Sequence, residues 1–311
     1  MSGIGIWLPL ILVMVLLALR IPVSMAFLSG AVFYFGFIAT EMPLNMILSK
    51  MVSAGMNMNL MAIPFFITAG LLMNYTGITS RMMKFADLCV GHMWGGLAQV
   101  NVLLSTLMGG VSGSAVADAA MESRILGPEM TRLGYARGWS AAINGLSGLI
   151  VATIPPSMGL IIYGTVGEVS IGRLFMAGWV PGVLMCVLLM LATTWSARHF
   201  GYKPEHDKPA PFKEIASAFF SSIWAMLFPI LLILLIRFGI MSPTESGAFA
   251  CAYALLVGLC IHRELTWDTL KQTLRESVKD VTVITIILAF SGVFGYGVVY
   301  DDITVTIAQG L

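Results

Sequence analysis

Apolar residues in this chain are grouped into blocks of about 20 residues, the length that an α-helix needs to cross the hydrocarbon core of a membrane. The first block is followed by Arg20-Ile21-Pro22 and not by small residues, so it predicts a membrane helix and not a cleaved signal peptide. The predicted fold class is therefore an all-α polytopic membrane protein. Its predicted spans are residues 4–19, 22–40, 58–74, 138–154, 175–196, 217–236, 244–262 and 281–299.

The composition also indicates that the bilayer is the solvent of this chain. Of its 311 residues, 58% are hydrophobic and 11% are charged, whereas about a quarter of the residues of soluble domains are charged. The net charge of +1 gives no argument for nucleic-acid binding, and none is expected. The four cysteines lack the spacing of Cys/His metal ligands, so we expect neither a disulfide framework nor a metal site built on them.

Residues 92–135 differ from the predicted spans. An apolar run from Leu97 to Met108 is too short to cross a membrane, and the glycine- and serine-rich residues 109–114 separate it from a second helical run that starts at Ala115. Such a pattern predicts a re-entrant hairpin, which enters and leaves the membrane on the same face.

The distribution of positive charge favours this hairpin, because cytoplasmic loops carry an excess of Lys and Arg. With the N-terminus in the periplasm and a hairpin at 92–135, 14 of the 17 Lys and Arg residues lie on the cytoplasmic side. Only Lys50, Arg173 and Arg237 then lie outside. A full traverse at 92–135 would reverse every later segment and spoil this asymmetry.

Two parts of the chain resemble each other at an offset of 221 to 225 residues. Pro22 and Pro243 each stand before small residues at the start of a predicted helix, and residues 63–79 can be laid over residues 286–304. On the predicted topology the two copies start on opposite sides of the membrane, as the inverted repeats of secondary transporters do.

This comparison predicts how the chain is divided. About 110 further residues would complete the second copy, so we expect it to be truncated. The expected parts are a first repeat of scaffold helices and a hairpin-bearing transport part at 1–200, a cytoplasmic linker at 201–215, and the start of the second repeat at 216–311.

The segment Gly109–Asp118 carries the first candidate chemistry. Unwound backbone at membrane depth must be buried in protein or line a wet cavity. Its carbonyls and the hydroxyls of Ser112 and Ser114 would form an all-oxygen environment, which hard cations prefer. The helix that resumes at Ala115 would direct its N-terminus at the same place and favour an anion there. Simple helix packing by small residues, with Asp118 as a cap or the partner of a nearby arginine, remains the alternative.

Pro155-Pro156, in an otherwise apolar run, form the second candidate segment. Two prolines remove two amide donors and break the helix, so the carbonyls of residues 151–154 become available as ligands. The alternative is a simple kink. The sequence contains neither a hydrolase nucleophile motif nor a Walker-type phosphate loop, so we predict that the chain is not an enzyme.

Three segments together, Gly109–Asp118, Ile154–Ser157 and Ala177–Gly182, resemble the large membrane subunit of tripartite ATP-independent periplasmic (TRAP) transporters, the DctM-like family. The resemblance runs from Ile6 to the last residue. It implies an elevator-type transporter in the bacterial inner membrane that imports a C4-dicarboxylate, sialic acid or a similar organic acid with sodium. It also implies two partners, a small four-helix membrane subunit and a periplasmic substrate-binding protein.

The resemblance further implies two sets of site residues, and sodium as the coupling ion with no other cofactor. The substrate would lie beside the hairpin tip, near Ser114, Ala115, Asp118, Pro156 and Ser157. The sodium ion would be held by Ser112, Ser114, Gly145, Thr153, Ile154 and Pro155. Two alternatives stay open: a stand-alone divalent-anion/sodium symporter that needs no binding protein, and a membrane scaffold or enzyme that transports nothing.

Overall fold

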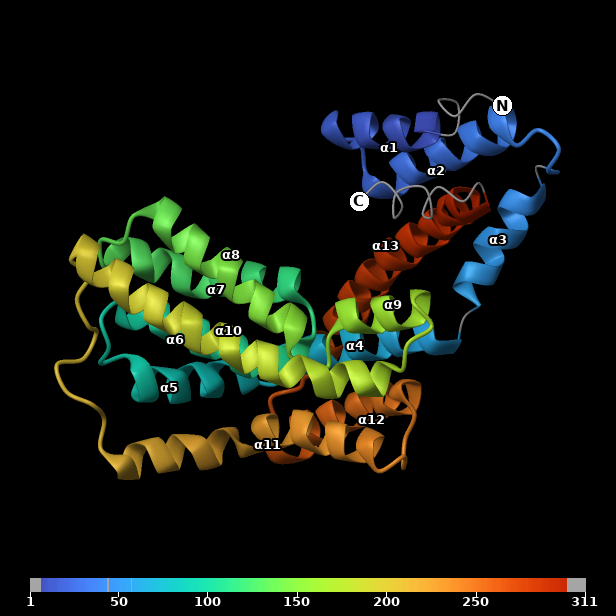
Figure 1. Cartoon of the computed structure of the whole chain (residues 1–311). Coiled ribbons are helices and arrows are strands. Elements are labelled where there is room, and N and C mark those ends of the chain that lie inside the picture. The colour runs from blue at the N-terminus through green and yellow to red at the C-terminus, as the bar shows by residue number, and fades with distance from the viewer. Residues whose placement is uncertain (1–6, 44, 57, 301–311) are drawn as a thin grey trace. The chain divides into compact units, whose positions relative to one another are not determined.

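The computed structural model describes residues 7–43, 45–56 and 58–300, and every regular element in these ranges is a helix (Figure 1). The predicted all-α class is therefore confirmed. The chain forms two compact units, Met1–Met58 with Val278–Leu311, and Asn59–Ser277.

The first unit is built from helices that surround a small aromatic core. In this core Tyr34 and Phe35 pack with Val13, Val293 and Phe294, all of them buried. In a membrane the lipid tails are as apolar as these side chains, so close van der Waals packing, and not transfer out of water, favours the association of these helices. Its elements are α1 (Leu8–Ala18), α2 (Val23–Phe33), the π-helix η2 (Tyr34–Ile38), α3 (Asn45–Gly55) and the last turns of α13 (Trp267–Tyr300).

The second unit holds the candidate segments. Helices α6, α7, α8 and α10 pack on one another, α4 packs against α12, and α5 packs against α11. Its elements are η3 (Met58–Met61), α4 (Ala62–Tyr75), α5 (Ile78–Val90), α6 (Gly96–Ser112), α7 (Ala115–Arg132), α8 (Arg137–Thr153), α9 (Met158–Val166), α10 (Ile171–Phe200), α11 (Phe212–Arg237), α12 (Pro243–Leu256), the π-helix η4 (Val257–Ile261) and the first turns of α13.

Each predicted span coincides with a helix, although several boundaries differ. Helices α10, α11, α12 with η4, and α13 are long and apolar enough to cross a membrane, and the bent pairs α4/α5 and α8/α9 could each form one further span. Helix α13 begins at Trp267, whereas the predicted span begins at 281. The prediction started late because the first turns of the helix carry charged side chains, which interrupt the apolar run. The apolar pattern missed α3, α5 and α9, which are short or amphipathic.

One pair of elements, a helix after a proline that ends in a π-helix, occurs twice along the chain; the repeat itself stays a prediction, and residues 301–304 of the second copy lie outside the described residues. Helix α2 follows Pro22 and ends in the π-helix 34–38, while α12 starts at Pro243 and ends in the π-helix 257–261. Both bounds of the second π-helix lie 223 residues after those of the first (34 to 257 and 38 to 261). The copies then diverge, because α3 and α4 are separate helices whereas α13 is continuous.

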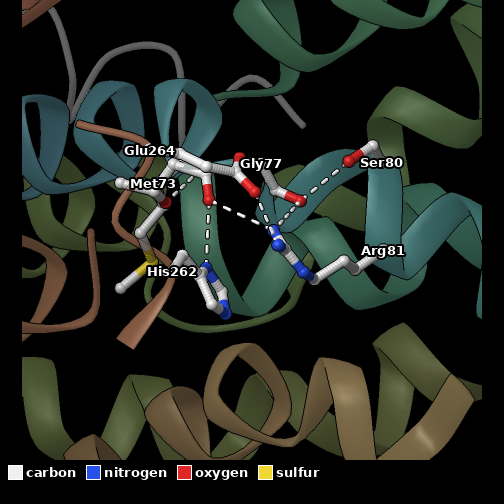
Figure 2. Close-up of polar contacts among 7 residues, drawn as sticks. Met73, Gly77, Ser80, Arg81, His262 and Glu264 are labelled. Carbon is white, nitrogen blue, oxygen red and sulfur yellow. Dashed lines mark hydrogen bonds and ion pairs between the residues drawn. The ribbon is translucent and has the colours of Figure 1, made fainter. Parts of the chain in front are cut away.

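The bend of 69° between α4 and α5 is held by the connection between η4 and α13 (Figure 2). Arg81 donates to the carbonyl of Gly77 at 3.0 Å and forms an ion pair with Glu264 at 2.5 Å. The Nδ1 atom of His262 lies 3.0 Å from the carbonyl of Thr76. Carbonyls that a broken helix leaves free are thus satisfied by protein groups, as a membrane environment requires.

The linker that follows α10 packs against the base of the hairpin. The amide of Glu205 donates to the carbonyl of Gly91 at 3.0 Å, and His206 Nε2 lies 3.1 Å from the carboxylate of Asp87. The hydrogen bond with Asp87 raises the pKa of His206 above its ordinary value. Protonation of this imidazole therefore strengthens the attachment of the linker to α5.

We expect this attachment to depend on pH. Because the pKa of His206 is higher in the folded protein than its unfolded value of about 6.5, the stabilisation is complete below about pH 6.5 and is lost as the pH rises through the raised pKa. Hydrogen exchange at the linker amides, corrected for intrinsic rates, should therefore be slower at low pH. His206→Gln should remove this dependence and His199→Gln should keep it; an unchanged profile in His206→Gln would show that the pair does not hold the linker.

Candidate functional site

The hairpin turns within two residues between α6 and α7. Gly113 ends α6 in the left-handed region, with φ at +62°, a conformation that favours glycine. Ser114 caps α7, since its hydroxyl accepts from the amide of Ala117 at 3.4 Å. The Gly/Ser segment therefore forms one tight turn and not an extended loop.

This turn, the hairpin tip, is docked on the break between α8 and α9. The amide of Met158 donates to the carbonyl of Gly113 at 3.1 Å, so each break satisfies a backbone group of the other. A Cβ atom at Gly113 would stand 2.4 Å from the carbonyl oxygen of Pro156. Only glycine allows the two breaks to approach this closely.

Glycines on other helices bring further backbone to the same place. A Cβ atom at Gly70 of α4 would lie 2.9 Å from the carbonyl oxygen of Ser112, and one at Gly178 of α10 would lie 2.4 Å from that of Thr153. On α6, a Cβ at Gly110 would lie 2.8 Å from the ring of Pro229 in α11. Six helices in addition to α9 thus meet around the tip and the break, namely α4, α6, α7, α8, α10 and α11, and they come close because glycines stand at the contact points.

The structure brings most, but not all, of the predicted sodium ligands together. The Ser112 hydroxyl is buried and has no hydrogen-bond partner among the described residues, so it fits a group that is completed by a bound cation. Ser114 and the segment Ile154–Pro155 lie at the same docked turn. Gly145 does not, because it is exposed on α8, about 12 Å along the axis before Thr153.

The predicted substrate residues differ in how far solvent reaches them. Ser114 and Ala115 are partly accessible, whereas Pro156 and Ser157 are buried. The Ser157 hydroxyl donates to the carbonyl of Ala152 at 2.5 Å and caps α9, so it already has a structural role. Asp118 is buried, and neither of its carboxyl oxygens has a partner among the described residues. The alternative in which Asp118 pairs with a nearby arginine is therefore wrong.

Sequence reasoning missed a buried polar core behind the tip. Glu122 is fully buried and its two carboxylate oxygens accept from the Ser105 hydroxyl at 2.7 and 2.8 Å. The Ser147 hydroxyl donates to the side-chain oxygen of Asn101 at 2.8 Å, and the side-chain amide of Asn101 lies 3.3 Å from the side-chain oxygen of Asn144. These bonds join both arms of the hairpin to α8.

A spacing rule could have marked the polar face of each helix, although not that the three faces meet. Each of the three helices contributes two polar side chains three or four residues apart, which places both on one face. The pairs are Asn101 and Ser105, Asp118 and Glu122, and Asn144 and Ser147. A cavity of about 460 Å³ reaches Glu122 and extends to Arg137 at the start of α8.

A hairpin of two helices whose turn is docked on a broken neighbouring helix, in an all-α polytopic protein, is the arrangement typical of membrane transport proteins with discontinuous helices. The chain belongs to the DctM component family of the tripartite ATP-independent periplasmic transporters, whose model matches residues 10–311. This is a family of transport proteins and not of enzymes, as the sequence predicts.

Several curated relatives are similar over most of this chain. It is 35% identical over 294 residues to the 2,3-diketo-L-gulonate TRAP transporter large permease YiaN of Escherichia coli, covering 94% of this chain and 68% of that protein. It is 33% identical to the sialic acid TRAP transporter permease SiaT of Haemophilus influenzae, with 98% and 49% covered. It is 30% identical to the C4-dicarboxylate permease DctM of Rhodobacter capsulatus, with 94% and 69% covered. The chain thus spans between about half and two thirds of these relatives' lengths.

Gly113→Ala should separate the hairpin tip from the α8/α9 break. The left-handed conformation of an alanine costs about 1–2 kcal/mol of stability, and the overlap of its Cβ with the Pro156 carbonyl costs about 1–3 kcal/mol more. Gly134→Ala is the matched control, since Gly134 has φ at +84° and nothing within 4 Å of its Cβ position. Thermal unfolding in detergent should show a clearly larger loss for Gly113→Ala; equal losses would mean that the docking adds nothing to stability.

Glu122→Ala should destabilise the hairpin by about 1–3 kcal/mol, because the Ser105 hydroxyl would lose its acceptor in a buried site. Glu129→Ala removes a partly exposed carboxylate from the same helix and should cost no more than about 0.5 kcal/mol. Denaturant or thermal unfolding of the two variants provides the comparison. If the two variants lost the same free energy of unfolding, the buried network would have no role in holding the two arms of the hairpin together.

Proposed function

We propose that this chain acts as the large membrane subunit of a sodium-coupled TRAP transporter that imports an organic acid. The observation that carries the proposal is the docking of the hairpin tip on the Pro-Pro break, with the unpartnered Ser112 hydroxyl beside it. Family membership supports the class of protein, and the named relatives act on diketogulonate, sialic acid and C4-dicarboxylates.

The electrostatics of the paired breaks support a cation at the tip. Helices α6 and α8 both end there, at Ser112 and Thr153, and a helix C-terminus carries a partial negative charge. Sodium would be held by the hydroxyls of Ser112 and Ser114 and by backbone carbonyls of Thr153–Pro155. These are the hard oxygen donors that such an ion prefers.

The same arrangement supports an anionic substrate next to the cation. Helices α7 and α9 both begin at the breaks, and their N-termini carry a partial positive charge. A substrate carboxylate beside Ser114 and Ala115 would meet these N-termini and the bound cation together. Discontinuous helices in secondary transporters combine ion and substrate sites in this way.

The remaining parts of the proposal concern movement, location and partners. The hairpin-bearing part would move against the scaffold helices as an elevator, in the inner membrane and with the N-terminus in the periplasm. The asymmetry of Lys and Arg supports this orientation. A small four-helix membrane subunit would complete the membrane part, and a periplasmic binding protein would deliver the substrate.

Reconstitution tests the proposed function. Proteoliposomes that hold the complete polypeptide and its small subunit should take up the organic acid only when both a sodium gradient and the binding protein are present. Uptake without the binding protein would favour a stand-alone symporter. No uptake under any condition would favour a membrane protein that transports nothing.

Ser112→Ala should raise the sodium concentration needed for half-maximal uptake about tenfold, because one oxygen ligand is lost. Ser221→Ala is the control, since among the described residues this hydroxyl bonds only to the carbonyl of Ala218 in its own helix. The measurement is uptake against sodium concentration at fixed substrate and binding protein. An unchanged sodium dependence in Ser112→Ala would remove the sodium site from the tip.

A further inference from the structure

A second cavity, of about 430 Å³, lies in the same unit where α10 begins and α11 ends. The two helices lie close together there: a Cβ atom at Gly172 would stand 2.9 Å from the side chain of Ile236. Arg173 in the first turn of α10 and Arg237 at the end of α11 both line the cavity. We call it the Arg173–Arg237 pocket.

No acidic side chain in the described part of the chain neutralises the positive charge of this pocket. Among the described residues, neither guanidinium forms a hydrogen bond or an ion pair, and no residue that lines the pocket is acidic. On the predicted topology, these are two of only three Lys and Arg residues on the periplasmic side. Two exposed arginines that line one hollow offer charged hydrogen-bond donors to an anion there.

The remaining walls indicate what kind of anion fits. Met176, Ile236 and Met241 line the pocket beside the arginines, and Met176 is 41% exposed. A small hydrophilic anion would gain nothing from these apolar walls. An amphiphile with an anionic head and an apolar body would contact both kinds of surface.

The position of the pocket matches the level of lipid head groups. Helices α10 and α11 are both long and apolar enough to cross a membrane, and the pocket lies where one starts and the other stops. Such helix ends lie at the boundary between hydrocarbon and water, where basic side chains interact with anionic lipid.

We propose that the Arg173–Arg237 pocket binds the phosphate head group of an anionic phospholipid, with the two guanidinium groups on the phosphate oxygens and the lipid body against Met176 and Ile236. Arginine suits this role, because its planar fork of donors matches a phosphate group. The site is separate from the hairpin tip, and the inference does not rest on the proposed transport function.

Lipid titration of the purified complete polypeptide in a non-ionic detergent tests this inference without any transport assay. Phosphatidylglycerol and phosphatidylcholine with identical acyl chains are compared by the rise in Tm and by native mass spectrometry of retained lipid. The double variant R173Q/R237Q should bind phosphatidylglycerol about 30-fold more weakly. The control variant K203Q/K213Q removes two charges near the opposite ends of the same helices and should keep the wild-type response.

Three outcomes would overturn the proposal. Equal stabilisation by phosphatidylcholine would remove the role of the anionic head, and an unchanged response in R173Q/R237Q would remove the role of the pocket. Stabilisation by inorganic phosphate at the same concentrations as by phosphatidylglycerol would make this a site for a free anion. A Tm rise and a retained lipid that require both arginines, with no effect of inorganic phosphate, would support the lipid site.

Discussion

A helix broken inside a membrane leaves backbone groups that lipid does not satisfy, and this constraint organises the second unit. The protein meets it by placing two breaks together, so that the Met158 amide donates to the Gly113 carbonyl. Neither break is independent of the other after that. The glycines at 70, 113 and 178 follow from the same requirement, because a side chain at any of them would meet backbone atoms of the tip or of the break.

Pairing the breaks also places unlike helix ends next to one another. Two C-termini and two N-termini meet at the tip, so one small volume favours both a cation and an anion. If each ion improves the site for the other, the two affinities are coupled reciprocally, as linkage requires. The proposed coupling between sodium and an organic acid then needs no conformational change to link two distant sites. The ions would interact directly across the same pair of breaks.

Much of this architecture could be predicted from the sequence, since lengths of apolar runs and the positions of Gly and Pro are local signals. The hairpin turn at Gly113 and the break at Pro155-Pro156 were found in this way. Helix α5 was not, because its charged residues interrupt the apolar pattern. The polar core around Glu122 was missed for another reason. Its members come from three helices, and their convergence depends on packing that no single segment reveals.

The α4/α5 bend meets the same constraint by a different route from the tip. Its carbonyls are not matched by another broken backbone but by side chains, Arg81 from the following helix and His262 from the connection after η4. On the division predicted from the sequence, that connection belongs to the second repeat, whereas the bend belongs to the first. The bend is therefore completed by residues almost 190 positions away. Within the second unit, the bend in the first half of the chain therefore depends on residues from the second half, so it is not stabilised by its own segment alone.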